Sequence, residues 1–225
     1  MKIVADENLA FTEYFFADFG EIQQVAGRTL THADVKDAEA LLVRSVTQVN
    51  AELVQDTRLK FVGSATIGTD HLDIAALEQC NIAWSNAAGC NAQAVAEYVI
   101  TALLHLKPEL IDANDSFTLG IIGLGNVGSR LAVMAKLLGW KVIGHDPFVQ
   151  REQIEQVDLN TLLKTADAIS THVPLTKTGN HPTYHLINAE ALAQMKPTAI
   201  LINSARGPVV EESALIVDIQ QTQRA

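Results

Sequence analysis

Three glycines, at Gly123, Gly125 and Gly128, have the Gly-x-Gly-x-x-Gly spacing that is typical of dinucleotide-binding sites. In such a site the first glycine permits a tight turn, and the second lets the backbone approach a pyrophosphate. The third lets the following helix pack closely on the strand. The amides of Asn126 and Val127 would then face the pyrophosphate at the positive end of that helix. The segment therefore predicts a dinucleotide-binding turn, with an ordinary tight strand–helix turn as the alternative.

The residues around these glycines favour the dinucleotide. An apolar strand is expected at Phe117–Ile122 and an amphipathic helix at Val127–Leu138, which is the setting that the motif requires. A second expected strand ends in Asp146, 18 residues after Gly128, close to the spacing of a carboxylate that binds a ribose. Because this carboxylate would repel the extra phosphate of NADP, the sequence predicts NAD as the cofactor. The alternative for Asp146 is a turn residue before Pro147.

Apolar strands and amphipathic helices alternate along the whole chain. Strands are expected at Lys2–Asp6, Ala40–Val46, Lys60–Ala65, Ile82–Asn86, Phe117–Gly123, Lys141–Asp146, Ala168–Val173 and Ala199–Ser204. Helices are expected at Asn8–Phe19, Asp70–Gln79, Asn91–Leu106, Val127–Leu138, Leu159–Thr165 and Ala189–Met195. Strands joined by helices need crossover connections, which produce a mostly parallel sheet with helices on both faces. The predicted fold class is therefore α/β, with Rossmann-like, doubly wound parallel sheets.

A polar stretch that contains a proline, Lys107–Ser116, separates a long apolar helix from a new strand. Such a change in composition predicts a boundary between two α/β domains, residues 1–107 and 108–225. A surface loop inside one domain is the alternative.

The composition excludes several classes of partner. The chain has 225 residues and a formal net charge of −10, which makes it a poor general binder of nucleic acid or of an anionic membrane. Any anionic substrate must therefore meet a local positive site. No apolar run approaches the roughly 18 residues of a membrane span. Cys80 and Cys90 have no metal-binding spacing, so we expect no metal site and a reduced, cytoplasmic protein.

Four segments of the chain resemble the D-2-hydroxyacid dehydrogenases. They are V-G-S-A-T-I-G-T-D-H-L-D at Val62–Asp73, N-A-A-G-C-N-A-Q-A-V-A-E at Asn86–Glu97, H-V-P-L-T-K-T at His172–Thr178 and I-N-S-A-R-G-P-V-V at Ile202–Val210. The resemblance implies that residues 1–107 are the N-terminal part of a flavodoxin-like substrate domain. It also implies that residues 108–225 belong to an NAD-binding Rossmann domain, incomplete at its C-terminal end. A homodimer is the implied assembly of the full-length protein.

Shorter segments resemble the branch of this family that oxidises a small phosphorylated 2-hydroxy acid. Among them are V-R-S-V-T at Val43–Thr47 and A-T-I-G-T-D-H at Ala65–His71. Ser45 and Thr66 match the substrate-contacting positions of that branch, and both stand at the ends of expected strands, where open α/β sheets bind ligands. The residues alone would also fit ordinary strand-end turns. Arg44 is a possible phosphate partner, and a solvated arginine at a strand end is the alternative.

Arg206, in the segment S-A-R-G, matches the family's catalytic arginine. Its planar fork suits a carboxylate bidentately and can polarise the carbonyl that forms beside it. A surface arginine in a turn before Gly207 is the alternative. Ser204, Ala205 and Val173 match positions that line the family's NAD site, with Val173 acting through its backbone and through apolar contact.

Removal of a hydride from an alcohol also needs a base, usually a histidine. The resemblance places that histidine and its carboxylate partner downstream of residue 225, so we expect this chain to be the N-terminal portion of a longer enzyme. Alone, it would bind NAD weakly and turn over nothing. Another D-2-hydroxyacid dehydrogenase, for example one for phosphoglycerate, and a non-catalytic NAD-binding module stay open as alternatives. A plain α/β domain with a fortuitous glycine turn is a third.

Overall fold

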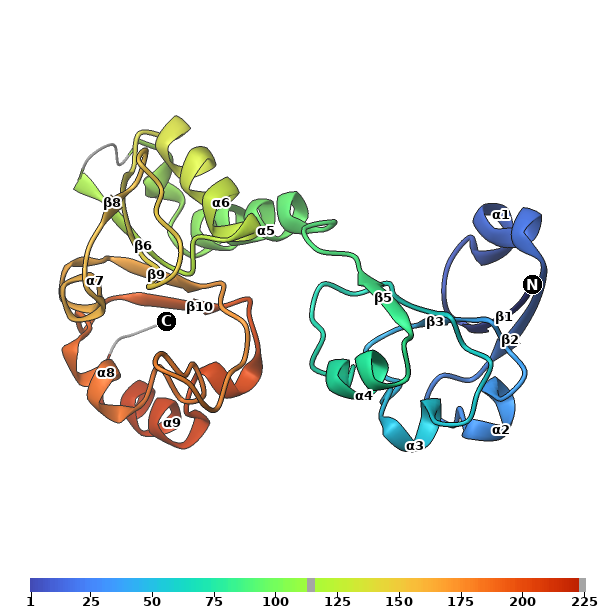
Figure 1. The fold of residues 1–225 in the computed structure, drawn as a ribbon. Helices are drawn as coiled ribbons and strands as arrows, with labels where there is room; N and C mark the ends of the chain where they lie inside the picture. The colour runs from blue at the N-terminus through green and yellow to red at the C-terminus, as the bar shows by residue number, and fades with distance from the viewer. Residues whose placement is uncertain (113–115, 223–225) are drawn as a thin grey trace. The chain divides into compact units, whose positions relative to one another are not determined.

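The computed structural model describes residues 1–112 and 116–222, and these divide into two compact units, Met1–Cys90 and Asn91–Ala225 (Figure 1). In the described part of each unit, five parallel strands form one sheet with helices on both faces. The expectation of two doubly wound α/β units is confirmed. No helix in the described part of the chain is long and apolar enough to cross a membrane.

The first unit has the strand order β2-β1-β3-β4-β5. Its strands are β1 (Lys2–Asp6), β2 (Glu21–Val25), β3 (Ala40–Val43), β4 (Phe61–Ser64) and β5 (Ala83–Asn86). Every residue of β3 is buried, which is the continuous apolar run expected of a central parallel strand. The chain leaves β1 for β2 on one side and returns to β3 on the other. The order therefore reverses between β1 and β3, and the carboxyl ends of these two strands flank a topological switch point, where doubly wound folds bind their ligands.

Short helices cover both faces of this first sheet. On one face lie α2 (His32–Val35), α3 (Ala51–Val54) and α4 (Ile74–Gln79), whose buried residues pack with those of β1, β3 and β4. On the other face Phe16, from α1 (Thr12–Phe16), packs against Ile3, Ala5, Ala40 and Leu42. A 3₁₀ turn, η1 (Ala17–Phe19), follows α1.

The second unit has the strand order β10-β9-β6-β7-β8, with its switch point between β6 and β9. Its strands are β6 (Thr118–Ile122), β7 (Lys141–His145), β8 (Glu155–Gln156), β9 (Ala168–Thr171) and β10 (Ile200–Asn203). One face carries α5 (Ala92–Leu106) and α6 (Asn126–Leu137). The other carries α7 (Leu159–Thr165), α8 (Ala189–Gln194) and α9 (Glu212–Gln221). Two 3₁₀ turns, η2 (Pro108–Asp112) and η4 (Gly207–Val209), complete the described elements.

The structure adds elements that the sequence pattern did not predict. All eight expected strands are present: β1 has its expected bounds, and the other seven are shorter by one to three residues. β2, β8, α2 and α3 were missed. β2 is the sequence E-I-Q-Q-V, in which no residue is buried, and β8 has two residues, so neither has the apolar run that marks a strand. The first helix begins at Thr12 and not at Asn8, because Phe11 has a left-handed backbone (φ 58°) that a helix cannot continue through.

The division between the units also differs from the predicted boundary at residues 107 and 108. The units separate at Cys90 and Asn91, because α5 packs on α6 within the second unit. The polar stretch Lys107–Ser116 connects α5 to β6, and residues 113–115 of it lie outside the described residues.

Candidate functional site

The glycine turn after β6 has the backbone that its sequence predicted. Gly123 has φ +94°, and a Cβ placed on it would lie 2.6 Å from the carbonyl oxygen of His172. A Cβ on Gly128 would lie 1.9 Å from the carbonyl oxygen of Gly123, so α6 can pack against the turn only through a glycine. A Cβ on Gly125 would meet nothing within 4 Å, so the space in front of this glycine is open. The three glycines thus separate into two that packing requires and one that faces open space.

The amino end of α6 suits an anion. Gly125 is the N-cap residue, and no side chain caps the twelve-residue helix. The amides of its first residues, Asn126 and Val127, therefore stand beside the open space at Gly125, where the helix dipole favours negative charge. An open space and a helix end without a side-chain cap are what the pyrophosphate of NAD requires, so the residues present fit this cofactor.

Asp146 follows β7 and is held by three backbone amides. Its Oδ2 accepts a hydrogen bond from Leu124 N at 2.8 Å, and its Oδ1 accepts from Phe148 N at 2.9 Å and Val149 N at 3.0 Å. A carboxylate offers about four acceptor positions, so roughly one remains for a ribose hydroxyl. The turn role and the ribose role are therefore compatible, and the bond to Leu124 fixes the carboxylate beside the glycine turn.

Arg151 also belongs to this edge, and the sequence analysis missed it. Its Nε donates to the carbonyl oxygen of Leu124 at 3.2 Å and to Oγ of Ser129 at 3.1 Å. These bonds tie the segment after β7 to the glycine turn. No local sequence pattern predicts these contacts of Arg151, because its partners lie 22 and 27 residues earlier in the chain.

The loop after β10 holds Ser204, Ala205 and Arg206, all half-buried. The side chain of Asn203 closes this loop: its Oδ1 accepts from Ala205 N at 3.1 Å, and its Nδ2 donates to Arg206 O at 2.9 Å. Buried Thr171 in β9 donates to the same Oδ1 at 2.8 Å. Asn203 and Thr171, which the sequence analysis did not single out, therefore shape the backbone of the loop that holds Arg206.

His172 follows β9 and lies between the loop and the glycine turn. Its Nδ1 is 3.0 Å from Oγ of Ser204, and its Nε2 is 2.9 Å from Oγ of Ser170. Burial lowers the pKa of His172 from 6.5 to about 4, so the imidazole is neutral near pH 7. Val173, the next residue, contacts the glycine turn: its Cγ1 lies 3.0 Å from a Cβ placed on Gly123. The positions predicted for the cofactor thus lie along the carboxyl ends of β6, β7, β9 and β10.

In the first unit, Ser45 and Thr66 follow β3 and β4, two neighbouring strands. Ser45 is exposed and Thr66 is half-buried. The Thr66 hydroxyl lies 2.9 Å from Oγ of Ser64, which in turn lies 2.9 Å from Nε2 of buried His71. His71 thus belongs to this hydrogen-bonded chain, while Asp73 caps the helix α4 that follows.

The second unit contains the residues that match a known protein family. Residues 107–225 match the model described as "D-isomer specific 2-hydroxyacid dehydrogenase, NAD binding domain", which is more than half of the chain. The chain belongs to the D-isomer specific 2-hydroxyacid dehydrogenases. In this family the matched residues form the NAD-binding domain, in agreement with the predicted cofactor. No group of three or more His, Cys, Asp or Glu side chains suited to a metal ion occurs in the described part of the chain.

Relatives of this chain match both units. Erythronate-4-phosphate dehydrogenase from Acinetobacter baumannii (strain ATCC 17978) is 71% identical over 224 residues, and the same enzyme from Acinetobacter baylyi is 67% identical over 224 residues. Each match covers 100% of this chain and 63% of the relative, so the chain spans less than two thirds of their length. Among solved structures, the D-lactate dehydrogenase of Aquifex aeolicus, complexed with NAD and lactic acid, matches with a TM-score of 0.84 at 26% identity. That match covers 100% of this chain and 74% of the other.

Proposed function

We propose that the protein oxidises 4-phospho-D-erythronate to 2-oxo-3-hydroxy-4-phosphobutanoate with NAD as the oxidant. The observation that supports this substrate is the 71% identity with erythronate-4-phosphate dehydrogenase, which extends over the whole chain and includes the first unit. The first unit is where Ser45 and Thr66, the expected substrate contacts, stand at neighbouring strand ends.

The oxidation removes a hydride from the carbon that bears the 2-hydroxyl, which NAD would accept, and a proton from that hydroxyl, which the histidine base implied by the family resemblance would accept. Arg206 is the residue proposed to act on the substrate: its guanidinium would bind the carboxylate and polarise the forming carbonyl. Ser45 and Thr66 would donate hydrogen bonds to the substrate's anionic groups. Gly123, Gly125, Asn126, Val127 and Gly128 would hold the pyrophosphate of NAD.

Asp146 would accept a hydrogen bond from the adenosine ribose, and Val173, Ser204, Ala205 and Arg206 would line the rest of the cofactor site. The half-buried position of the 204–206 loop and its bracing by Asn203 support this arrangement, because a braced loop holds a guanidinium in one place.

The same proposal places the reaction in the synthesis of pyridoxal 5′-phosphate, in the cytoplasm, by a homodimer. Sedimentation of the protein from its native source would test the dimer, which requires twice the mass of one chain.

The test of the activity is a comparison of substrates with the protein purified from its native source. NADH formation is followed by its absorbance with 4-phospho-D-erythronate and, separately, with 3-phosphoglycerate. We expect the first substrate to react with the higher kcat/KM. Faster reaction of 3-phosphoglycerate would assign the protein to another branch of the family. NAD binding without oxidation of either acid would favour a non-catalytic binding module.

A further inference from the structure

Arg151 is a charged side chain at the cofactor edge of the second unit that none of the proposed roles uses. It is exposed and lies in the segment between β7 and β8. Its Nε–H is shared between the carbonyl oxygen of Leu124 at 3.2 Å and Oγ of Ser129 at 3.1 Å. The Ser129 hydroxyl donates to the same carbonyl oxygen at 2.7 Å. Two side chains therefore hold one carbonyl group of the glycine turn.

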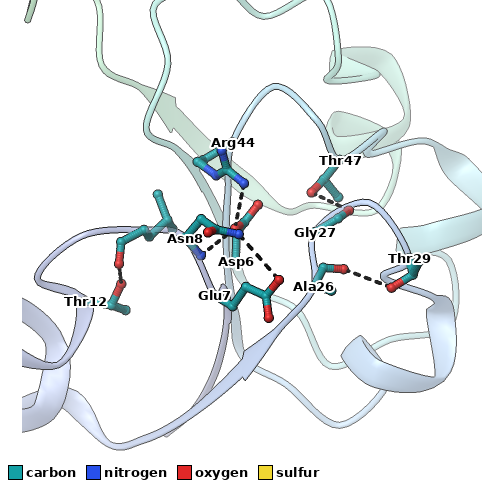
Figure 2. A network of polar contacts seen from close by, with 10 residues as sticks. Asp6, Glu7, Asn8, Thr12, Ala26, Gly27, Thr29, Arg44 and Thr47 are labelled. Carbon is teal, nitrogen blue, oxygen red and sulfur yellow. Dashed lines mark hydrogen bonds and ion pairs between the residues drawn. The ribbon is translucent and has the colours of Figure 1, made fainter.

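No ion pair explains the position of this guanidinium. In the first unit, by contrast, Nη2 of Arg44 lies 3.1 Å from Oδ1 of Asp6 (Figure 2). Among the described residues, no carboxylate forms an ion pair with Arg151, and no acceptor binds its Nη1 or Nη2. Hydrogen bonds from an exposed side chain contribute little to stability. The use of Arg151 must therefore be sought in the groups that it holds.

The backbone around Arg151 is anchored by a closed ring of hydrogen bonds. The Arg151 amide donates to Oε1 of Gln156 in β8 at 2.9 Å, and Nε2 of Gln156 donates to the carbonyl of Val149 at 2.8 Å. The Val149 amide donates to Oδ1 of Asp146 at 3.0 Å, and Oδ2 of Asp146 accepts from the Leu124 amide at 2.8 Å. The bond from Arg151 to the Leu124 carbonyl closes the ring. The carboxylate expected to bind the ribose is thereby joined to the glycine turn.

Leu124 is held at both ends of its backbone. Its amide binds Asp146, its carbonyl oxygen binds Arg151 and Ser129, and its side chain is buried. Because the peptide bond to Gly125 is planar and trans, the Leu124 carbonyl and the Gly125 amide point in opposite directions. Holding the carbonyl oxygen therefore also fixes the direction of the amide at Gly125, the glycine that faces open space.

We propose that Arg151 is a positioning residue of the cofactor site, which acts through Leu124 to orient the glycine turn and the Asp146 carboxylate. The ligand that meets both is the adenosine diphosphate part of NAD. A turn and a carboxylate that are not held must be ordered at each binding event, which lowers the affinity. The inference rests on the proposed function, through the roles of these residues in binding NAD, and not on which hydroxy acid is oxidised.

The test is a calorimetric titration of the intact chain with NAD, with ADP-ribose and with NADP. The variants are R151Q, R151K and, as a matched control, R130Q, which removes an exposed arginine of α6 next to Ser129. The variant S129A, alone and combined with R151Q, probes the shared carbonyl. Urea unfolding followed by the fluorescence of buried Trp140, in a Trp84→Phe background, verifies that the second unit of each variant is folded.

We expect R151Q to weaken the binding of NAD and of ADP-ribose by the same factor, about tenfold, with no change in the urea midpoint. R130Q should leave the affinity unchanged. R151K should restore it only in part, because lysine keeps the charge but has no Nε–H. Unchanged NAD affinity of folded R151Q would overturn the proposal. An equal loss in R130Q, or full recovery in R151K, would also overturn it, because charge alone would then explain the effect.

NADP and S129A separate positioning from a direct contact between Arg151 and a phosphate of the cofactor. Positioning predicts that R151Q weakens NADP binding less than NAD binding, because the Asp146 carboxylate that repels the 2′-phosphate is no longer fixed. It also predicts that S129A and R151Q together weaken NAD binding by less than the product of their separate effects, since both act on one carbonyl. A greater loss for NADP, or fully multiplicative effects, would overturn the positioning role.

The titration needs neither a hydroxy acid nor turnover. It can therefore fail while NAD-dependent oxidation is observed, or succeed while oxidation is absent. Absence of NAD binding by the folded wild type would overturn the inference together with the proposed cofactor contacts.

Discussion

The carboxyl edges of the two sheets differ in the groups that they offer to an anion. In the second unit these groups belong to the backbone: they are a glycine turn and the amides at the start of α6, a helix of twelve residues. In the first unit side chains stand at the corresponding edge, namely Arg44, Ser45 and Thr66, with Asp6 behind Arg44. Both edges are formed by parallel strands of a doubly wound sheet.

Helix length accounts for much of this difference. The helices of the first unit have four to six residues, so they offer little of the aligned dipole that favours an anion at α6. The positive group at the carboxyl edge of the first unit is instead a side chain, that of Arg44. Two sheets of the same class therefore carry positive potential at their carboxyl edges on different groups, backbone amides in one and a guanidinium in the other.

The largest effect is expected from Gly128→Ala. The added Cβ would lie 1.9 Å from the Gly123 carbonyl oxygen, and backbone must shift to relieve that overlap. We expect the second unit to lose about 3 kcal/mol or more of its free energy of unfolding, together with NAD binding. Urea unfolding followed by the fluorescence of buried Trp140, in a Trp84→Phe background, measures the loss for this unit. Unchanged stability would mean that α6 can move away from the turn at little cost.

A pH-dependent effect of similar size is expected at His172. Because burial lowers its pKa from 6.5 to about 4, the unfolded chain binds a proton at a higher pH than the folded unit does. The stability that this histidine contributes is therefore complete above pH 6.5 and falls as the pH drops to about 4, by up to about 3 kcal/mol.

The variant H172N isolates this contribution, because its amide can still reach Ser204 but does not titrate. The difference in unfolding free energy between wild type and H172N, measured by Trp140 fluorescence across this pH range, should shrink toward low pH. A difference that does not change with pH would contradict the burial of a neutral imidazole at this position.

An intermediate effect is expected from Asp6→Asn in the first unit. The variant keeps an acceptor for the Asn8 amide but removes the charge that faces Arg44. Since Arg44 is partly exposed, we expect a loss of about 2 kcal/mol, less than for a fully buried pair. Trp84 fluorescence in a Trp140→Phe background measures it. A more stable variant would show that the ion pair between Asp6 and Arg44 does not stabilise the first unit.

The smallest effect on unfolding is expected from Gly125→Ala, the matched control for Gly128→Ala. Its Cβ would meet nothing within 4 Å, and the backbone (φ −71°) is one that alanine adopts, so stability should change by less than about 0.5 kcal/mol. The methyl group would occupy the space in front of the turn, so NAD affinity should fall about tenfold or more by calorimetry. Unchanged affinity would place the pyrophosphate elsewhere.

The second unit could be predicted more fully than the first. The glycine spacing, the apolar strand before it and Asp146 at the end of the next strand are all local features, and the structure has each of them where the sequence predicted it. The edge strands β2 and β8 were missed because half-exposed or very short strands lack an apolar run. The substrate-contacting roles of Ser45 and Thr66 stay predictions, since they depend on a family resemblance.

Contiguous residues therefore encode the central strands, the amphipathic helices and the glycine turn with its following helix. The tertiary structure alone decided which distant side chains meet, as Asp6 does Arg44, Thr171 does Asn203 and His172 does Ser204. Asp6 and Arg44 stand at the ends of β1 and β3, which are not consecutive strands. The other two pairs stand at the ends of β9 and β10, which a long crossover separates in the sequence. The order of parallel strands in a sheet is set by the packing of whole helices on its two faces, and no local pattern of residues specifies it.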